Sequence, residues 1–310
     1  MTIGIRLRGA VLAVAAVLAM AMPATAEARA RTILFVGNSF TYAAYSPVRR
    51  YRAETVTDLN GEGIGGVPAL FKLFTQEAGL DYAVSLETVG GKGLDYHYDR
   101  KRELIDRAWD VVMLQGLSTL DRDRPGDPTT HVRYAALLAA MFHDRNPEVQ
   151  VELTSTWSRA DLTYKPDGHW YGKPITAMAI DLRAASDLAL ASSKQIAGVV
   201  PVGEAWNRAI AEKVADPDPY DGISFGQVDL WTYDQYHGSM YGYYLEALVI
   251  FGKVTGLDPR SLGDKEQAAD DLGISPAIAA ALRQVAFEQL EAGSPDPPVI
   301  GLPPQLPSGR

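Results

Sequence analysis

The sequence predicts an α/β protein whose parallel β-sheet is covered by helices on both faces. Short apolar runs of strand length alternate along the chain with longer stretches in which apolar residues recur at helical spacing. Strands that alternate with helices form βαβ units, and such units build parallel sheets. The chain has 310 residues and is 47% hydrophobic, which is enough for one well-buried core in a single large domain.

Five short runs rich in Val, Ile and Leu are the predicted strands. Apolar runs with little alternation are typical of strands that are buried on both faces of a sheet. The runs are "TILFV" at 32–36, "YAVSLETV" at 82–89, "DVVMLQ" at 110–115, "VQVELTST" at 149–156 and "AGVVPV" at 197–202.

Six helices are predicted between and after these strands. The first has Pro68 near its start and Gly79 at its end, which are the positions that proline and glycine favour in helices. The last is largely apolar, which indicates a buried helix. The predicted ranges are 67–79, 99–109, 131–145, 175–195, 203–213 and 239–256.

Two long irregular stretches, roughly 43–66 and 157–174, interrupt the alternation. Loops of this length in a compact domain are usually functional or disordered. The second reads "WSRADLTYKPDGHWYGKP" and carries several aromatic residues. We interpret it either as a flap that contacts the substrate or as a variable surface insertion.

Both ends of the chain predict segments outside the folded domain, which we place at 31–292. Residues 1–26 have two arginines, a 14-residue apolar run and small residues, the pattern of a secretory signal peptide. The alternative is a membrane anchor, but the run is shorter than the roughly 20 residues of a bilayer span. We therefore expect export to the periplasm or the exterior. The proline-rich residues 293–310 predict an extended, disordered tail.

The composition excludes several classes of protein. The chain has no cysteine, which excludes disulfides, a cysteine nucleophile and cysteine-ligated metal. A net charge of −9 argues against nucleic acid or an anionic membrane as the main partner. "GEGIGG" at 61–66 matches the glycine pattern of a dinucleotide site but lacks the hydrophobic strand that must precede it. We expect neither an organic cofactor nor a metal. The oligomeric state is not indicated.

Ser39 directly follows the first predicted strand, in "ILFVGNSFTY" at 33–42. Ligands of parallel α/β sheets bind at the carboxyl ends of the strands, so Ser39 is placed where chemistry can occur. A serine hydroxyl is a poor nucleophile unless a base takes its proton and a third group orients that base. His237 has Asp234 three residues before it, close enough in a turn for the carboxylate to bond the imidazole. By itself this spacing is not specific.

Backbone and side-chain amides that could stabilise an oxyanion follow the second and third predicted strands. Gly90, Gly91 and Gly93 follow the second strand, whereas Gln115 and Ser118 lie at the end of the third. Donors aimed at a developing oxyanion are a large part of acyl-transfer catalysis. The alternative interpretation of the glycines is that they only allow tight turns.

The order of these motifs resembles the SGNH (GDSL-like) hydrolase superfamily over residues 32–256. "GNSFT" at 37–41 resembles its first block with Asn in place of Asp, "GGKGLDYH" at 90–97 its second, and "DQYH" at 234–237 its last. The first block most resembles secreted bacterial members. The resemblance implies a three-layer α/β/α sandwich with a flavodoxin-like, five-stranded parallel sheet.

The resemblance also implies a role for each site residue. Ser39 would be the nucleophile, His237 the base and Asp234 its orienting partner. The oxyanion would be held by the backbone N–H groups of Ser39 and Gly91, with Gly90 and Gly93 as alternatives to Gly91, and by an amide from the third block. The Asn of that block is absent, so Gln115 is expected in its place, with Ser118 as the alternative. The predicted substrate contacts are Asn38, His97, Trp157 and Trp170.

The expected reaction is hydrolysis of an ester bond, most simply removal of an acetyl group from a carbohydrate. Aromatic faces stack on sugar rings, and the segments "DGHWYG" and "LWTYDQYHGSMYGYY" are rich in aromatic residues. A lipid or aryl esterase is the alternative among enzymes. A catalytically inactive carbohydrate-binding protein on the same scaffold is the alternative outside them.

Overall fold

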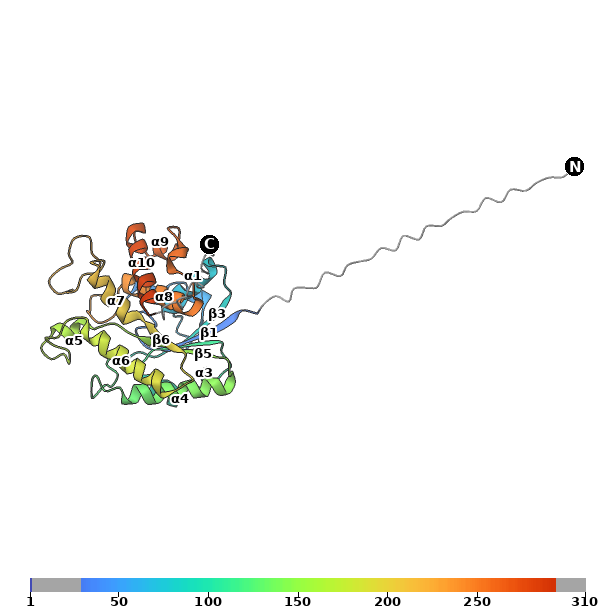
Figure 1. Ribbon diagram of the computed structural model, residues 1–310, viewed down its shortest axis with the longest axis horizontal. Helices are drawn as coiled ribbons and strands as arrows, with labels where there is room; N and C mark the ends of the chain where they lie inside the picture. The colour runs from blue at the N-terminus through green and yellow to red at the C-terminus, as the bar shows by residue number, and fades with distance from the viewer. Residues whose placement is uncertain (2–28, 294–310) are drawn as a thin grey trace, which may run out of the picture.

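The computed structural model describes residues 1 and 29–293 and shows one parallel β-sheet between two helical layers (Figure 1). This confirms the predicted α/β/α architecture. The predicted signal peptide and almost all of the predicted tail lie outside the described residues. The strands, in the order β2-β3-β1-β4-β5-β6, are β1 Arg31–Gly37, β2 Thr57–Asp58, β3 Tyr82–Thr88, β4 Val111–Leu114, β5 Gln150–Ser155 and β6 Gly198–Pro201.

The five predicted strands are all present, and each boundary lies within one residue of its prediction. The sixth strand, β2, is a two-residue edge strand inside the stretch that was predicted to be irregular. It pairs with β3, Thr57 opposite Ser85. Two polar residues carry no hydrophobic pattern, so this strand exists only because the edge of β3 offers backbone partners.

The two faces of the sheet have separate cores. In β1, Ile33 and Phe35 belong to one core, whereas Leu34 and Val36 belong to the other. Alternate side chains of a strand point to opposite faces, and here both faces are covered. The first core is covered by α1 Gly66–Glu77, α7 Val202–Ala211, α8 Met240–Thr255 and α10 Pro276–Ala292, and the second by α2 Leu94–Arg100, α3 Arg102–Ile105, α4 Thr129–Arg145 and α6 Ala177–Ser192 (Figure 1).

The prediction of a single helix over residues 99–109 is wrong. The chain is helical from Leu94, directly after the glycines of the second block, and Lys101 separates α2 from α3. The residues from Asp106 to β4 are not helical. Leu94 and Ile105 bury their side chains in the second core, so tertiary packing decides where this helical segment begins and ends.

The structure contains α10, which was not predicted. Ser275 caps its first turn and Pro276 occupies the first helical position, which is a signal that the sequence carries. α10 packs against α8 and α7 and so joins the first helical layer. The remaining elements are α5 Ala160–Tyr164, α9 Gln267–Asp271, and three short 3₁₀ turns, η1 Pro47–Arg50, η2 Ala53–Thr55 and η3 Pro259–Leu262.

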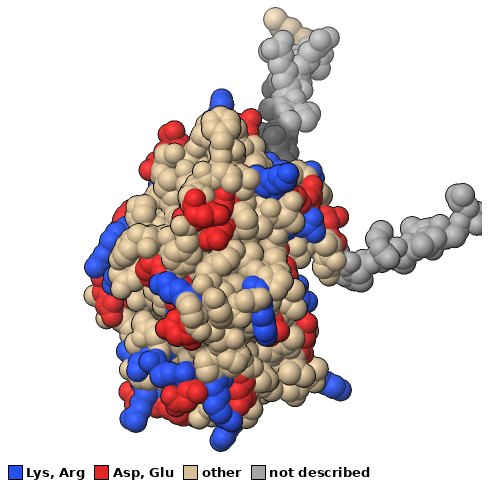
Figure 2. Space-filling view, turned by 90° about the vertical axis from the view of Figure 1, so that its left-hand side faces the viewer, with Lys and Arg blue, Asp and Glu red and all other residues tan. Residues whose placement is uncertain are grey.

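The face toward which the strands run carries charges of both signs. Lys and Arg side chains are interspersed there with Asp and Glu, and the basic groups do not merge into one continuous area on the face that is visible in Figure 2. Residues 29–293 contain no helix that is both long and apolar enough to span a bilayer.

Candidate active site

Ser39 lies in a tight turn at the carboxyl end of β1. The turn requires glycine at position 37, because a Cβ there would lie 2.1 Å from Thr41 Oγ1. The Ser39 carbonyl accepts a hydrogen bond from the Ala44 N–H at 2.9 Å, whereas no hydrogen bond within residues 29–293 uses the Ser39 N–H. The Ser39 side chain is therefore held at the strand tip with a free backbone donor beside it.

Gln115 ties this turn to the end of β4. Its Oε1 accepts from the Asn38 N–H at 3.0 Å and from Thr41 Oγ1 at 3.1 Å, and its Nε2 donates to the Gly116 carbonyl. A backbone N–H can only donate, so the atom facing Asn38 is the amide oxygen. These contacts indicate that Gln115 holds the Ser39 turn in place, and its predicted role as an oxyanion donor stays a prediction.

Asn38 is also a structural residue. Its side-chain amide donates to the carbonyls of Lys92 at 2.9 Å and Gly116 at 3.0 Å, and its Oδ1 accepts from the Phe40 N–H. Both amide protons are used and the residue is buried. Asn38 therefore links the loops that follow β3 and β4 around the Ser39 turn, and its predicted contact with the substrate stays a prediction.

His237 and Asp234 form the hydrogen-bonded pair that the spacing predicts. His237 Nδ1 lies 2.6 Å from Asp234 Oδ2, and the other carboxylate oxygen accepts the N–H groups of Tyr236 and His237 at 3.0 and 2.9 Å. Because a carboxylate can only accept, Nδ1 carries the imidazole proton. Nε2 is then the basic nitrogen, and it has no hydrogen-bond partner among the described residues.

The environment keeps Asp234 ionised. Burial acts to raise the pKa of its carboxyl group, but the hydrogen bonds from the His237 side chain and from two backbone N–H groups outweigh burial and lower that pKa overall. A carboxylate in this position orients the imidazole and stabilises its protonated form.

The segments that carry Ser39 and His237 lie against each other. The ring centroid of Phe40, the residue after Ser39, is 5.6 Å from that of His237, and that of Tyr45 is 5.1 Å away. Tyr243, near the start of α8, donates its hydroxyl to the Ser39 carbonyl at 3.4 Å. Ser39 Oγ and His237 Nε2 are not hydrogen-bonded to each other.

The second block forms a turn that needs its glycines. Gly91 has φ of +66°, a left-handed conformation that glycine adopts without strain. A Cβ at Gly90 would lie 2.8 Å from the Tyr42 hydroxyl. The carbonyl of Gly91 accepts from Arg122 Nη2 at 2.6 Å, which fixes this turn to the loop after β4.

His97 is fully buried below this turn, so the prediction that it contacts the substrate is wrong. Its Nδ1 lies 2.5 Å from Glu87 Oε2, and the other Glu87 oxygen accepts from Asn60 Nδ2 at 3.2 Å. Neither side chain of the Glu87–His97 pair is exposed. The pair connects β3 to α2 across the glycines of the second block.

The predictions for Trp157 and Trp170 are also wrong, because both side chains have no exposed surface. Trp157 stacks on Trp206 with a centroid distance of 4.4 Å, and its indole N–H donates to the Tyr236 carbonyl at 3.2 Å. Trp170 donates to Asp181 at 2.7 Å. Trp157 and Trp170 anchor this loop to the core, and Trp157 supports the segment of His237.

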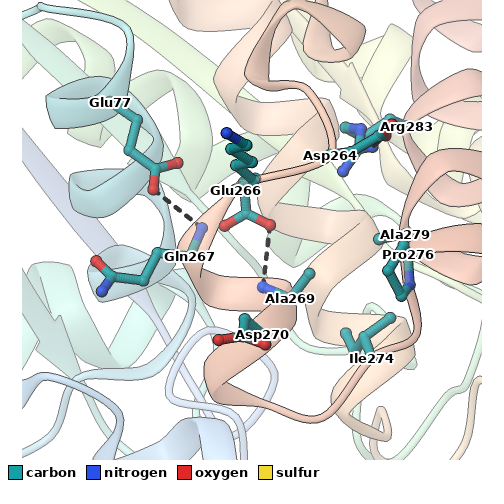
Figure 3. A pocket seen from close by; sticks show the side chains of 11 residues that line it. Glu77, Asp264, Glu266, Gln267, Ala269, Asp270, Ile274, Pro276, Ala279 and Arg283 are labelled. Atoms are coloured by element: carbon teal, nitrogen blue, oxygen red, sulfur yellow. Dashed lines mark hydrogen bonds and ion pairs between the residues drawn. The ribbon is translucent and has the colours of Figure 1, made fainter.

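A cavity of about 530 Å³ lies beside α9 and α10, and none of the predicted site residues lines it (Figure 3). Its carboxylates serve the fold. Glu266 accepts the N–H of Ala269 at 3.0 Å, and Glu77 accepts that of Gln267 at 3.0 Å. In the described part of the chain no cluster of three or more His, Asp or Glu side chains is arranged to hold a metal ion.

No protein-family model matches the chain, and no curated protein matches its sequence. Among solved structures, a DUF4886 family protein from Bacteroides uniformis superimposes with a TM-score of 0.58 at 18% identity, over 85% of this chain and 95% of that one. A protein from Parabacteroides merdae assigned as a GDSL-like lipase gives 0.50 at 20% identity, over 73% and 95%. The chain therefore has the fold of the GDSL-like hydrolases, as its motifs predict.

Proposed function

We propose that this protein is a serine hydrolase of ester bonds, with Ser39 as nucleophile, His237 as base and Asp234 as its orienting partner. The observation that carries the proposal is the His237–Asp234 pair. Its hydrogen bond of 2.6 Å leaves Nε2 free, on a segment that packs against the Ser39 turn. The GDSL-like fold supports the same reaction class.

The proposed reaction has two halves. Ser39 Oγ bonds to the ester carbonyl carbon while its proton passes to His237 Nε2, and the carbonyl oxygen becomes an oxyanion. The bond to the alcohol then breaks, and the alcohol leaves with the proton from Nε2. A water molecule attacks the acyl-serine with the same proton transfers, which releases the acid and restores Ser39.

We propose the Ser39 and Gly91 N–H groups as donors to the oxyanion. The Ser39 N–H has no partner in the described structure, and Gly91 is the left-handed residue of the adjacent turn. Each such donor stabilises the transition state by about 3–4 kcal/mol. A third donor is either the second amide proton of Gln115 or the Ser118 hydroxyl, which is buried without a partner.

For the substrate we propose an acetyl ester of a carbohydrate, which the exported protein would meet in the periplasm or outside the cell. The aromatic residues Tyr45 and Tyr233, whose rings pack edge to face 5.5 Å apart, remain well exposed beside His237. Exposed aromatic rings at a site suit the apolar faces of sugars. We expect neither a metal nor an organic cofactor to take part.

Labelling with a fluorophosphonate probe tests this function. The wild-type protein should react and Ser39→Ala should not, whereas Ser261→Ala, which removes an exposed serine of η3, should label like the wild type. A wild-type protein that ignores the probe would instead be an inactive binding protein. Comparison of kcat/KM on acetylated oligosaccharides and on long-chain aryl esters then tests the substrate class, and a preference for long chains contradicts the carbohydrate proposal.

A further inference from the structure

We propose that a cavity beside the Ser39 turn binds the alcohol part of the ester, and that this alcohol is a neutral, polyhydroxylated ring such as a sugar. The inference rests on the function proposed above and names the part of the protein that selects the substrate. The cavity, here called the β3/β4 cavity, has a volume of about 350 Å³. It lies between the turn of residues 91–96 after β3 and the loop of residues 117–123 after β4, with Thr130.

The strand order places this cavity next to the nucleophile. β1 lies between β3 and β4, so the Ser39 turn lies between the two loops that form the cavity walls. The side-chain amide of Asn38 donates hydrogen bonds to both of these loops, to the carbonyls of Lys92 and Gly116. Gly91, a proposed oxyanion donor, is itself part of the lining. An ester whose carbonyl oxygen is bound by Gly91 therefore has one of its two substituents at the cavity.

The lining is polar and carries both signs of charge. Lys92 and Arg122 provide cations, whereas Asp95, Asp121 and Asp123 provide carboxylates. An alkyl chain would remove these groups from water without replacing their hydrogen bonds, which is unfavourable. A polyanion would meet more carboxylates than cations. A neutral ring with several hydroxyl groups can both donate to the carboxylates and accept from the cations.

Three of these charged groups, Lys92, Asp95 and Asp123, have no ion pair or side-chain hydrogen bond within the described residues, and the first two lie on the β3 side of the cavity. The Lys92 ammonium lies 5.0 Å from the centre of the Tyr96 ring, and within the described residues no ion pair joins it to a carboxylate. The Asp95 carboxylate, in the first turn of α2, likewise accepts no hydrogen bond there. By contrast, the Asp121 carboxylate accepts the N–H groups of Asp123 and Arg124, and the Arg122 guanidinium donates to the Gly91 carbonyl. The side chains of Asp121 and Arg122 therefore stabilise the loops around the cavity.

The test compares two substrates that share the acetyl group and differ in the alcohol. Acetylated xylo-oligosaccharides have a polyhydroxylated alcohol part, whereas 4-nitrophenyl acetate has none. For Asp95→Ala and for Lys92→Met, kcat/KM should fall about 10-fold or more on the oligosaccharide, mainly through KM, because a hydrogen bond to a charged group is lost. On 4-nitrophenyl acetate it should stay within about twofold of wild type. Asp144→Ala, on the exposed end of α4, is the matched control and should change neither value.

The outcomes separate this inference from the function on which it rests. If kcat/KM of the variants falls equally on both substrates, the residues support the oxyanion turn rather than the alcohol. If kcat/KM is unchanged on both substrates, the cavity is not used. Either result overturns the inference. A changed preference for acyl chain length in the variants would make the cavity an acyl site and overturn it as well. If the wild type hydrolyses neither ester and is not labelled by the fluorophosphonate, the proposed function itself fails.

Discussion

Lowering the pH from 7 to 4 should destabilise the protein through one buried imidazole, that of His131 in α4. His131 lies against the end of β4, where its Nδ1 is 2.5 Å from the position that a Cβ of Gly116 would occupy. Neither ring nitrogen has a hydrogen-bond partner among the described residues. Burial lowers the pKa of this imidazole from its ordinary 6.5 to about 4.

The sign follows from the direction of this pKa shift. Below pH 6.5 the unfolded chain binds a proton at His131 that the folded protein does not bind until the pH approaches 4. Stability is therefore unaffected by this group above pH 6.5 and is lost progressively as the pH falls from 6.5 to 4. The two pKa values correspond to a loss of about 2 kcal/mol at pH 5 and about 3 kcal/mol at pH 4.

The assay is the free energy of unfolding by urea, measured at several pH values between 7 and 4. His131→Leu and His131→Gln both remove the titrating group but differ in how they fill its site. Between pH 7 and pH 4, the free energy of unfolding of both variants should fall by about 3 kcal/mol less than that of wild type, whatever the stability of the variants at pH 7. Curves that run parallel for wild type and both variants would refute the argument from burial.

Three further substitutions test the assignments in the site. Gln115→Leu should reduce stability by about 1–3 kcal/mol, since it leaves a buried backbone N–H unpaired, as urea unfolding would show; a loss of kcat at full stability would instead identify an oxyanion donor. Gly37→Ala should abolish ester hydrolysis, because the new Cβ would displace Thr41 and the turn, and an active variant would show that the turn can adapt. Asp234→Asn should lower kcat about 10³–10⁴-fold at pH 7 by losing the required tautomer of His237, and a loss below tenfold contradicts its role.

The main strands of the sheet were predictable because a strand that is buried on both faces is an uninterrupted run of apolar residues in the sequence. The run at 32–36 is apolar without interruption, and Ile33 and Leu34 indeed face different cores. The pairing of Asp234 with His237 was predictable for a similar reason, since three residues of a turn suffice to bring them together. In contrast, β2 has no signal of its own and depends on the edge of β3.

The wrong site predictions concern residues whose partners are distant in sequence or set by packing. His97 has two aspartates near it in sequence, yet its partner is Glu87, which only the geometry of β3 and α2 brings to it. Trp157 and Trp170 lie in an irregular stretch that carries no periodicity, so nothing local indicates that they point into the core. Gln115 lies directly after β4, but its contact with the Asn38 N–H depends on the neighbouring strand β1 and has no signal in the sequence around it.

In the proposed mechanism Ser39 Oγ attacks the ester carbonyl carbon while His237 Nε2 takes the proton of that hydroxyl, and a crystal structure of the fluorophosphonate-treated protein would show whether the two side chains meet at one reaction centre. We expect a bond between Ser39 Oγ and phosphorus after loss of fluoride, and a phosphoryl oxygen about 2.7–3.1 Å from the Ser39 and Gly91 N–H groups. His237 Nε2 should lie within hydrogen-bonding distance of the adduct. Phosphorus attached to a different residue, or an imidazole turned away from the adduct, would contradict this mechanism.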